Sequence, residues 1–284
     1  MARGLDHLVV AVRDLDAAAA AWRAMGFRVG AENRHPFGTH NRLVQLADRT
    51  FIELLAVAEP GRVPEPVPGQ FSFAAFNRDL LRWREGLSTI ILKSADAAAD
   101  TAAFQGVGLG DFAMLEFFRG GERGDGTAVE VGFRLAFAAS PRLPDLAFAA
   151  CQHLTPDRFW DPALQHHANG AAATAAVVIV ADNPSDHHIF LSALTGVREM
   201  RATSLGVFIA LPTGAIEVVT PAAFAALYGA LATRAAIRFA VADLDRAAAT
   251  LAQGGVAHEA RGALIVVPAE AAGGVAVAFA AHGG

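Results

Sequence analysis

Internal repetition is the sequence feature that most restricts the fold of this 284-residue chain. Residues 11–19, AVRDLDAAA, recur as residues 240–248, AVADLDRAA, and Ile52-Glu53-Leu54 recurs as Ile216-Glu217-Val218. The first motif joins an apolar stretch of strand length to an alanine-rich stretch of helix length. The second motif lies within a later apolar strand. We therefore predict four tandem βαβββ units, paired into two halves.

The predicted fold class is α+β, with two half-barrel domains. Residues 1–152 hold the first pair of units, and residues 173–284 hold a second, degenerate pair. Residues 153–172 are polar and aromatic, contain two prolines, and are expected to link the halves. Hydrophobic residues make up 54% of the chain and charged residues 18%, which excludes disorder and supports a large core.

Composition also restricts the partners of the protein. The formal net charge is −5 and no basic stripe is present, so we expect no nucleic-acid partner. The longest uncharged apolar run, near residues 170–181, is too short to cross a bilayer, so we expect no membrane partner. Cys151 is the only cysteine, which excludes an intrachain disulfide and favours the reducing cytoplasm.

Two residues of the first unit stand out chemically. His7 lies near the start of an apolar strand, and Glu53 lies in the middle of another. A buried carboxylate is costly unless a cation, an arginine or a metal ion compensates its charge. Imidazole nitrogens together with a carboxylate oxygen suit Zn²⁺, Fe²⁺, Mn²⁺ or Ni²⁺. His7 and Glu53 are therefore candidate metal ligands, with Glu53 also a candidate catalytic residue.

Four stretches carry a resemblance to a known family. They are residues 6–16 (DHLVVAVRDLD), 51–55 (FIELL), 34–42 (RHPFGTHNR) and 151–155 (CQHLT), the last followed by HANGA at 167–171. The chain resembles the glyoxalase-like domain family of the vicinal oxygen chelate superfamily over nearly its whole length. The resemblance implies paired units that curl into a cup around a site.

The resemblance also implies a divalent metal held by the first and fourth strands of a unit. His7 and Glu53 match these positions. His153 is the first choice for the third ligand, and His35 and His40 come next. The first-strand position of the second unit, near residues 87–89, offers no strong ligand.

The loop after the first helix is a candidate substrate site. His35, His40, Asn41 and Arg42 bring two imidazoles, an amide and a guanidinium to the mouth of the first half, where they could position an anionic substrate. The predicted function is a metal-dependent lyase, isomerase or dioxygenase that acts on a small oxygenated molecule. The alternative is a metal-free small-molecule binding protein in which an arginine pairs with Glu53. A homodimer is also expected, because open half-barrel edges favour pairing.

The second half carries a weaker version of the site. Glu217 matches Glu53, but Ala175 and Ala236 stand where a histidine is expected. We therefore expect an arginine to pair with Glu217, from three candidates: Arg201, Arg234 and Arg238. The histidine pairs at residues 166–167 and 187–188 are expected at the surface, because adjacent side chains point in different directions and cannot chelate one ion.

Overall fold

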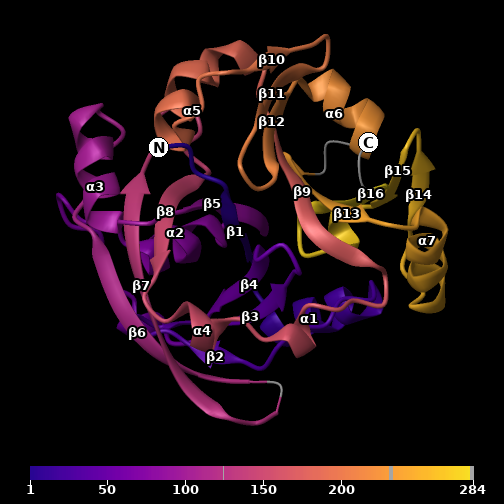
Figure 1. Ribbon diagram of the computed structural model, residues 1–284, viewed down its shortest axis with the longest axis horizontal. Helices are drawn as coiled ribbons and strands as arrows, with labels where there is room; N and C mark the ends of the chain where they lie inside the picture. The colour runs from indigo at the N-terminus through magenta and orange to yellow at the C-terminus, as the bar shows by residue number, and fades with distance from the viewer. Residues whose placement is uncertain (124, 230–232, 282–284) are drawn as a thin grey trace.

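The computed structural model describes residues 1–123, 125–229 and 233–281. It confirms the α+β class: each half forms an eight-stranded mixed sheet, and the first of the two curls into a nearly closed barrel (Figure 1). The strands of the first sheet are β1 (Leu5–Ala11), β2 (Asn33–Arg34), β3 (Thr39–Gln45), β4 (Phe51–Val57), β5 (Gly86–Lys93), β6 (Leu115–Glu122), β7 (Ala128–Ala138) and β8 (Ala147–His153). Those of the second are β9 (Ala171–Val180), β10 (Arg201–Ala202), β11 (Gly206–Ala210), β12 (Ala215–Val219), β13 (Ala235–Val241), β14 (Glu259–Arg261), β15 (Leu264–Val267) and β16 (Ala276–Ala281).

The strand order shows the repeat directly. The sheets run β2-β3-β4-β1-β5-β8-β7-β6 and β10-β11-β12-β9-β13-β16-β15-β14. In every unit the first strand pairs in parallel with the fourth, and the first strands of paired units meet in antiparallel fashion at the centre of the sheet. The helices of the four units are α1 (Leu15–Ala24), α3 (Ala97–Gly106), α5 (His188–Thr195) and α7 (Leu244–Gln253). The prediction of four βαβββ units is therefore confirmed.

Matching caps explain the repeated sequence motif. The Asp14 carboxylate accepts a hydrogen bond from the Ala17 amide at the start of α1, and Asp243 does the same for the Arg246 amide at the start of α7. An aspartate at this position satisfies amides that the helix leaves unpaired. Gly26 follows the end of α1 with φ at +88°, a backbone conformation that favours glycine.

Three further helices lie outside the repeat. They are α2 (Phe73–Leu80), α4 (Pro156–Phe159) and α6 (Pro221–Tyr228). Helix α2 begins after Ser72, whose hydroxyl accepts a hydrogen bond from the Ala75 amide. Thr220 caps α6 through a hydrogen bond from Ala223, and Pro221 is tolerated in the first turn.

One hydrophobic core runs through both halves. Phe27, which follows α1, packs against Phe239 of β13 and Phe279 of β16, with ring centroids 4.9 and 5.9 Å apart. Phe190 of α5 reaches Phe148 of β8 at 4.8 Å. Aromatic side chains on or next to the first helix of each half therefore pack against strands of the other half. The proposed domain limits stay a prediction, although the segment between the two sheets falls within residues 153–172. In the described parts of the chain, no helix combines the length and apolar character needed to cross a membrane.

Candidate functional site

The concave face of the first sheet forms a narrow cup. Its walls are mostly aromatic, and five charged or hydrogen-bonding side chains interrupt them: His7, His35, Asn41, Glu53 and Arg119. The room inside amounts to about 40 Å³ for the centre of a water-sized sphere, enough for a few water molecules. Phe51 stacks on the His7 ring with centroids 4.1 Å apart, which holds that imidazole in the cup.

A bulge in β1 brings two successive polar side chains to the same region. Leu5 pairs with Leu92 of β5, but His7 pairs with the adjacent Ile91, so Asp6 is an extra residue on β1. Such an insertion breaks the alternation of side chains along a strand. The Asp6 carboxylate consequently lies 2.6 Å from Nδ1 of His7 instead of on the opposite face.

Asp6 connects two histidines. The same carboxylate oxygen that accepts from His7 Nδ1 lies 3.1 Å from Nε2 of His153. Burial alone would raise the pKa of Asp6, but the charge of His153 and the hydrogen bonds from both imidazoles hold that pKa well below its ordinary value. Asp6 is thus an anion that fixes the orientation of His7 and leaves Nε2 directed into the cup.

Glu53 lies on the other side of His7. Its Oε2 atom is 3.7 Å from Nε2 of His7, and its Oε1 atom is 3.7 Å from Nε2 of His35. The Asn41 amide donates a hydrogen bond of 2.5 Å to Oε1. Glu53 is only 5% exposed, and the described residues offer it no arginine within ion-pair distance. The carboxylate is therefore surrounded by imidazole and amide groups.

His35 forms the opposite end of this polar chain. Its Nδ1 atom lies 2.8 Å from the hydroxyl of Thr39, and its ring stacks on Phe37. Burial lowers the pKa of His35 well below the ordinary value, and the charge of Arg119 adds to the effect. The imidazole is therefore neutral near pH 7.

Alternation along β3 separates the other predicted substrate residues. Thr39, Asn41 and Leu43 are buried, whereas His40 and Arg42 lie between them on the opposite face. His40 contacts Glu32 at 3.2 Å, and Arg42 contacts Asp16 at 2.9 Å. The geometry thus brings His35 and Asn41 to the cup and gives His40 and Arg42 no place in its wall. Their assignment to substrate stays a prediction.

Arg119 is a site residue that sequence reasoning missed. It lies on β6, next to the glycine-rich turn that connects β6 to β7. The side chain is 7% exposed, lines the cup, and its Nε atom has no partner among the described residues. Burial lowers the pKa of Arg119 to about 10, although Glu53 acts in the opposite direction. Arg119 remains a cation that can bind an anionic oxygen.

A second set of ligand atoms lies behind His7. Asp6, Cys151 and His153 each offer one ligand atom, and these three atoms lie within 4.8 Å of one another. Among the described residues, this is the one group of three potential metal ligands that converge in this way. His153 therefore converges with Asp6 and Cys151, and Asp6 separates it from His7 and Glu53. Burial raises the pKa of the Cys151 thiol well above its ordinary value, followed by the charges of Asp6 and Glu53.

On the second sheet, the face equivalent to the cup (the second cup) contains an ion pair. As predicted, an arginine pairs with Glu217. Arg238 of β13 pairs with Glu217 and also contacts the Tyr228 hydroxyl of α6 at 3.4 Å. Val9 pairs with Glu53 as Val178 pairs with Glu217, so the residue equivalent to His7 is Ala176. The expectation of Ala175 at that position was wrong by one residue.

Fold and cup together define a tandem scaffold of the vicinal oxygen chelate type. The profile of the glyoxalase-like domain matches residues 5–195, and the chain belongs to this family. No curated protein matches the chain.

Two solved structures are similar to the whole chain. A hypothetical protein from Staphylococcus aureus is 12% identical, with a TM-score of 0.66 over 99% of this chain and 100% of the other. A mutant of 4-hydroxymandelate synthase from Streptomyces coelicolor is also 12% identical, with a TM-score of 0.59 over 100% of this chain and 93% of the other. At these identities the likeness shows the fold alone.

Proposed function

We propose that the first cup is the active site of a metal-dependent lyase, isomerase or dioxygenase that acts on a small oxygenated molecule. The main support for this proposal is that the two equivalent glutamates, Glu53 and Glu217, have different partners. Glu217 has an arginine partner, whereas Glu53 faces His7, His35 and Asn41. A buried carboxylate held among imidazoles fits a metal ligand better than a structural ion pair.

Two pairs of candidate ligand atoms in the cup have the spacing that a divalent transition metal needs, although the ligand atoms of His7, Glu53 and His35 do not all lie within 4.8 Å of one another. Two ligands of one ion, each about 2.0–2.2 Å from it, lie at most about 4.4 Å apart. The separation of 3.7 Å between His7 Nε2 and Glu53 Oε2 is within that limit. His35 Nε2, at 3.7 Å from Glu53 Oε1, is the better third ligand, because its present partner is the neutral Asn41 amide at 3.3 Å, whereas Nε2 of the predicted third ligand, His153, faces the Asp6 carboxylate.

The support of His7 also fits a ligand role. Metal-binding imidazoles usually donate their second N–H to a carboxylate, which fixes the tautomer. Asp6 accepts this hydrogen bond from Nδ1 of His7, and His153 in turn holds Asp6. Asp6 is therefore a positioning residue that keeps the Nε2 lone pair of His7 directed at the site.

The remaining residues supply proton transfer and charge stabilisation. A bound divalent metal would polarise neighbouring oxygens of the substrate. Glu53 is the candidate base that takes a proton from the carbon beside a substrate carbonyl and returns it to the product. Arg119 lies in the same cup and would stabilise the negative charge that develops on the oxygen. The apolar walls give these charges a less polar environment than water, and the small free volume selects a small substrate.

Metal binding tests this proposal. Metal content as purified, without a polyhistidine tag, and uptake of Zn²⁺, Mn²⁺, Ni²⁺ and anaerobic Fe²⁺ are measured for the wild type, His7→Ala and Glu53→Gln. We expect about one equivalent in the wild type and loss of at least tenfold in affinity in both variants. Glu217→Gln is the matched control and should bind normally.

Two results would contradict the proposal. If the wild type takes up none of the four metals, the metal-free binding protein becomes the better account. If Cys151→Ala abolishes uptake while Glu53→Gln retains it, the ion belongs to the group of Asp6, Cys151 and His153 instead.

A further inference from the structure

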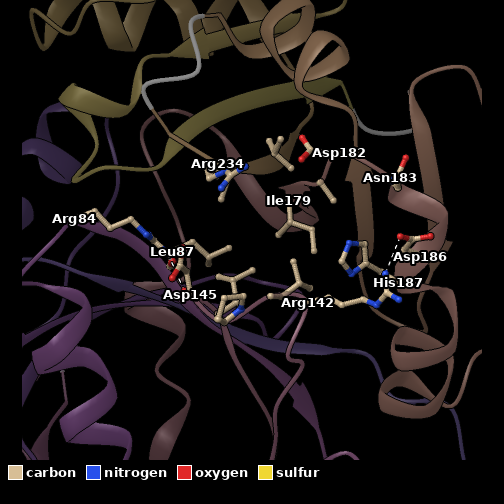
Figure 2. A pocket seen from close by; sticks show the side chains of 16 residues that line it. Arg84, Leu87, Arg142, Asp145, Ile179, Asp182, Asn183, Asp186, His187 and Arg234 are labelled. Atoms are coloured by element: carbon tan, nitrogen blue, oxygen red, sulfur yellow. Dashed lines mark hydrogen bonds and ion pairs between the residues drawn. The ribbon is translucent and has the colours of Figure 1, made fainter.

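A larger cleft lies between the two halves, and its lining shares no residue with that of the first cup. It has a volume of about 420 Å³ for the centre of a water-sized sphere, ten times that of the cup and in the range of small-molecule sites. Its lining comes from the segment before β5, the β7–β8 loop, the end of β9, the following turn and the start of β13 (Figure 2). Both halves must be present for this cleft to exist.

The floor of the cleft is apolar. Buried aliphatic side chains of both halves form it, among them Leu87, Leu143, Ile179 and Val180. These side chains are already almost fully buried, so they offer a small apolar surface against which a hydrocarbon or aromatic body can pack.

Two arginines at one end have no carboxylate partner. Arg84 donates to three backbone carbonyls, those of Glu85, Leu87 and Asp145, at 3.3, 3.0 and 2.8 Å. Two of its five N–H donors are left over among the described residues. Arg234 is exposed, and the described chain gives its side chain no hydrogen bond or ion pair. In Figure 2 both guanidinium groups lie at the same side of the cleft.

His187 is a buried polar group without a partner. The side chain is 5% exposed, and its Nδ1 atom is buried with no hydrogen bond in the described chain. Figure 2 shows the imidazole among the residues that face the cleft. Burial lowers the pKa of His187, so the ring is neutral and can donate or accept. An unpaired buried nitrogen is costly, and a ligand atom would satisfy it.

The lining of the cleft also holds three aspartates beside its three arginines. Asp186 is paired with Arg142 at 2.8 Å. Asp145 and Asp182 are exposed at the mouth, and the charge of Asp145 acts on Arg84 without an ion pair between the two side chains. Arg84 lies deeper and keeps its charge in a less polar environment.

We propose that this cleft is a second ligand site, for a small carboxylate with an apolar body. The carboxylate lies between Arg84 and Arg234, the apolar body lies on the aliphatic floor, and His187 contacts the far end. The site is independent of the cup and of metal chemistry there.

Phenylacetate and its neutral match phenylacetamide test the proposal on the full chain. Affinity is measured by calorimetry, and position by methyl resonances of Leu87 and Ile179 against those of Leu43 and Leu135 in the cup. We expect phenylacetate to shift the cleft methyls and to bind about tenfold more tightly than phenylacetamide. Arg234→Ala should remove that preference. Arg198→Ala, at an exposed arginine outside the cleft, should retain it.

Three outcomes would overturn the proposal. They are no shift of the cleft methyls by either probe at millimolar concentration, equal affinity for the acid and the amide, and equal effects of Arg234→Ala and Arg198→Ala. Arg234 is exposed, so its variant is expected to fold, and circular dichroism verifies this.

Discussion

At the scale of single residues, the first cup depends on how each charge is compensated. Asp6 holds His7 and His153, whereas Glu53 is left among His7, His35 and Asn41. A buried anion with two hydrogen-bonded imidazoles is stable only as long as both remain. The orientation of His7 therefore rests on Asp6, a residue that contacts no substrate in this account.

Asp6→Asn tests this positioning role. The substitution removes the charge that both imidazoles face, so we expect the free energy of unfolding to fall by about 2–4 kcal/mol and metal affinity to fall about 10–100-fold. Urea unfolding and metal titration measure the two effects. Asp16→Asn, at an exposed aspartate, is the control and should change stability by less than about 1 kcal/mol. Equal changes in unfolding free energy and in metal affinity for the two variants would show that Asp6 does not position His7.

His167 gives the protein a predicted sensitivity to acid. The sequence suggested a surface residue, but the side chain is 6% exposed, and its Nδ1 accepts from the Arg28 amide at 2.9 Å while Nε2 lies 2.9 Å from the Gln45 carbonyl. Burial lowers its pKa from 6.5 to about 4. The unfolded chain therefore binds a proton at higher pH than the folded chain, and stability is lost as the pH falls from 6.5 to 4.

Unfolding free energies between pH 4 and 7 measure this contribution. We expect the wild type to lose stability over that range more steeply than His167→Gln. His166→Gln, at the exposed neighbour, should keep the wild-type slope. An identical pH dependence for all three proteins would contradict the assignment.

At the scale of elements, the two cups differ by what fills them. Helix α6 places Phe224 and Tyr228 in the apolar cluster of the second cup, and Arg238 neutralises Glu217 there. In the first half the position equivalent to Arg238 is Ile91, which lines an open cup. Helix α2 contributes Phe73 to its wall but leaves free volume. The second half thus lacks the arrangement of histidines around a glutamate that the first cup has.

The Phe224→Ala variant tests whether the second half contributes to stability but not to metal binding. The ring is fully buried, so we expect a loss of about 3–5 kcal/mol in the free energy of unfolding and no change in metal uptake. Phe117→Ala in the first cup, where the ring is only partly buried, should cost less stability and should enlarge the cup. Denaturant unfolding with metal titration checks both variants. A loss of metal uptake in Phe224→Ala alone would place the working site in the second half.

The repeat and the proximity of His7 to Glu53 could be predicted from the sequence, because strand periodicity and the matched motifs are local features. The sequence did not suffice for Asp6, because strict alternation would place it on the face opposite His7, and the bulge depends on pairing with β5. Arg119 was missed because the burial of its strand depends on the curl of the sheet. The pairing of His153 with Asp6 likewise joins residues 147 positions apart.

At the scale of the whole molecule, the two halves share one core. Trp22 of α1 donates a hydrogen bond to the Ala272 carbonyl at 3.3 Å and packs against Phe239. Separation of the halves would expose these aromatic rings to water. The first sheet therefore relies on the second half for the face opposite its cup.

We expect a single cooperative unfolding transition for the full chain. Far-UV circular dichroism reports both sheets, while tryptophan fluorescence reports mainly the first half and the core, and the two curves should coincide. Phe279→Ala, in the last strand, should shift both curves together. Two separated transitions would show that the halves fold independently.

Anomalous diffraction from crystals soaked with Mn²⁺ or Zn²⁺ tests the central claim most directly, since it locates the ion. We predict one strong anomalous peak in the first cup, beside His7 Nε2 and Glu53, and no peak beside Glu217. A peak held only by Asp6, Cys151 and His153, or no peak in the first cup at a saturating metal concentration, would contradict it.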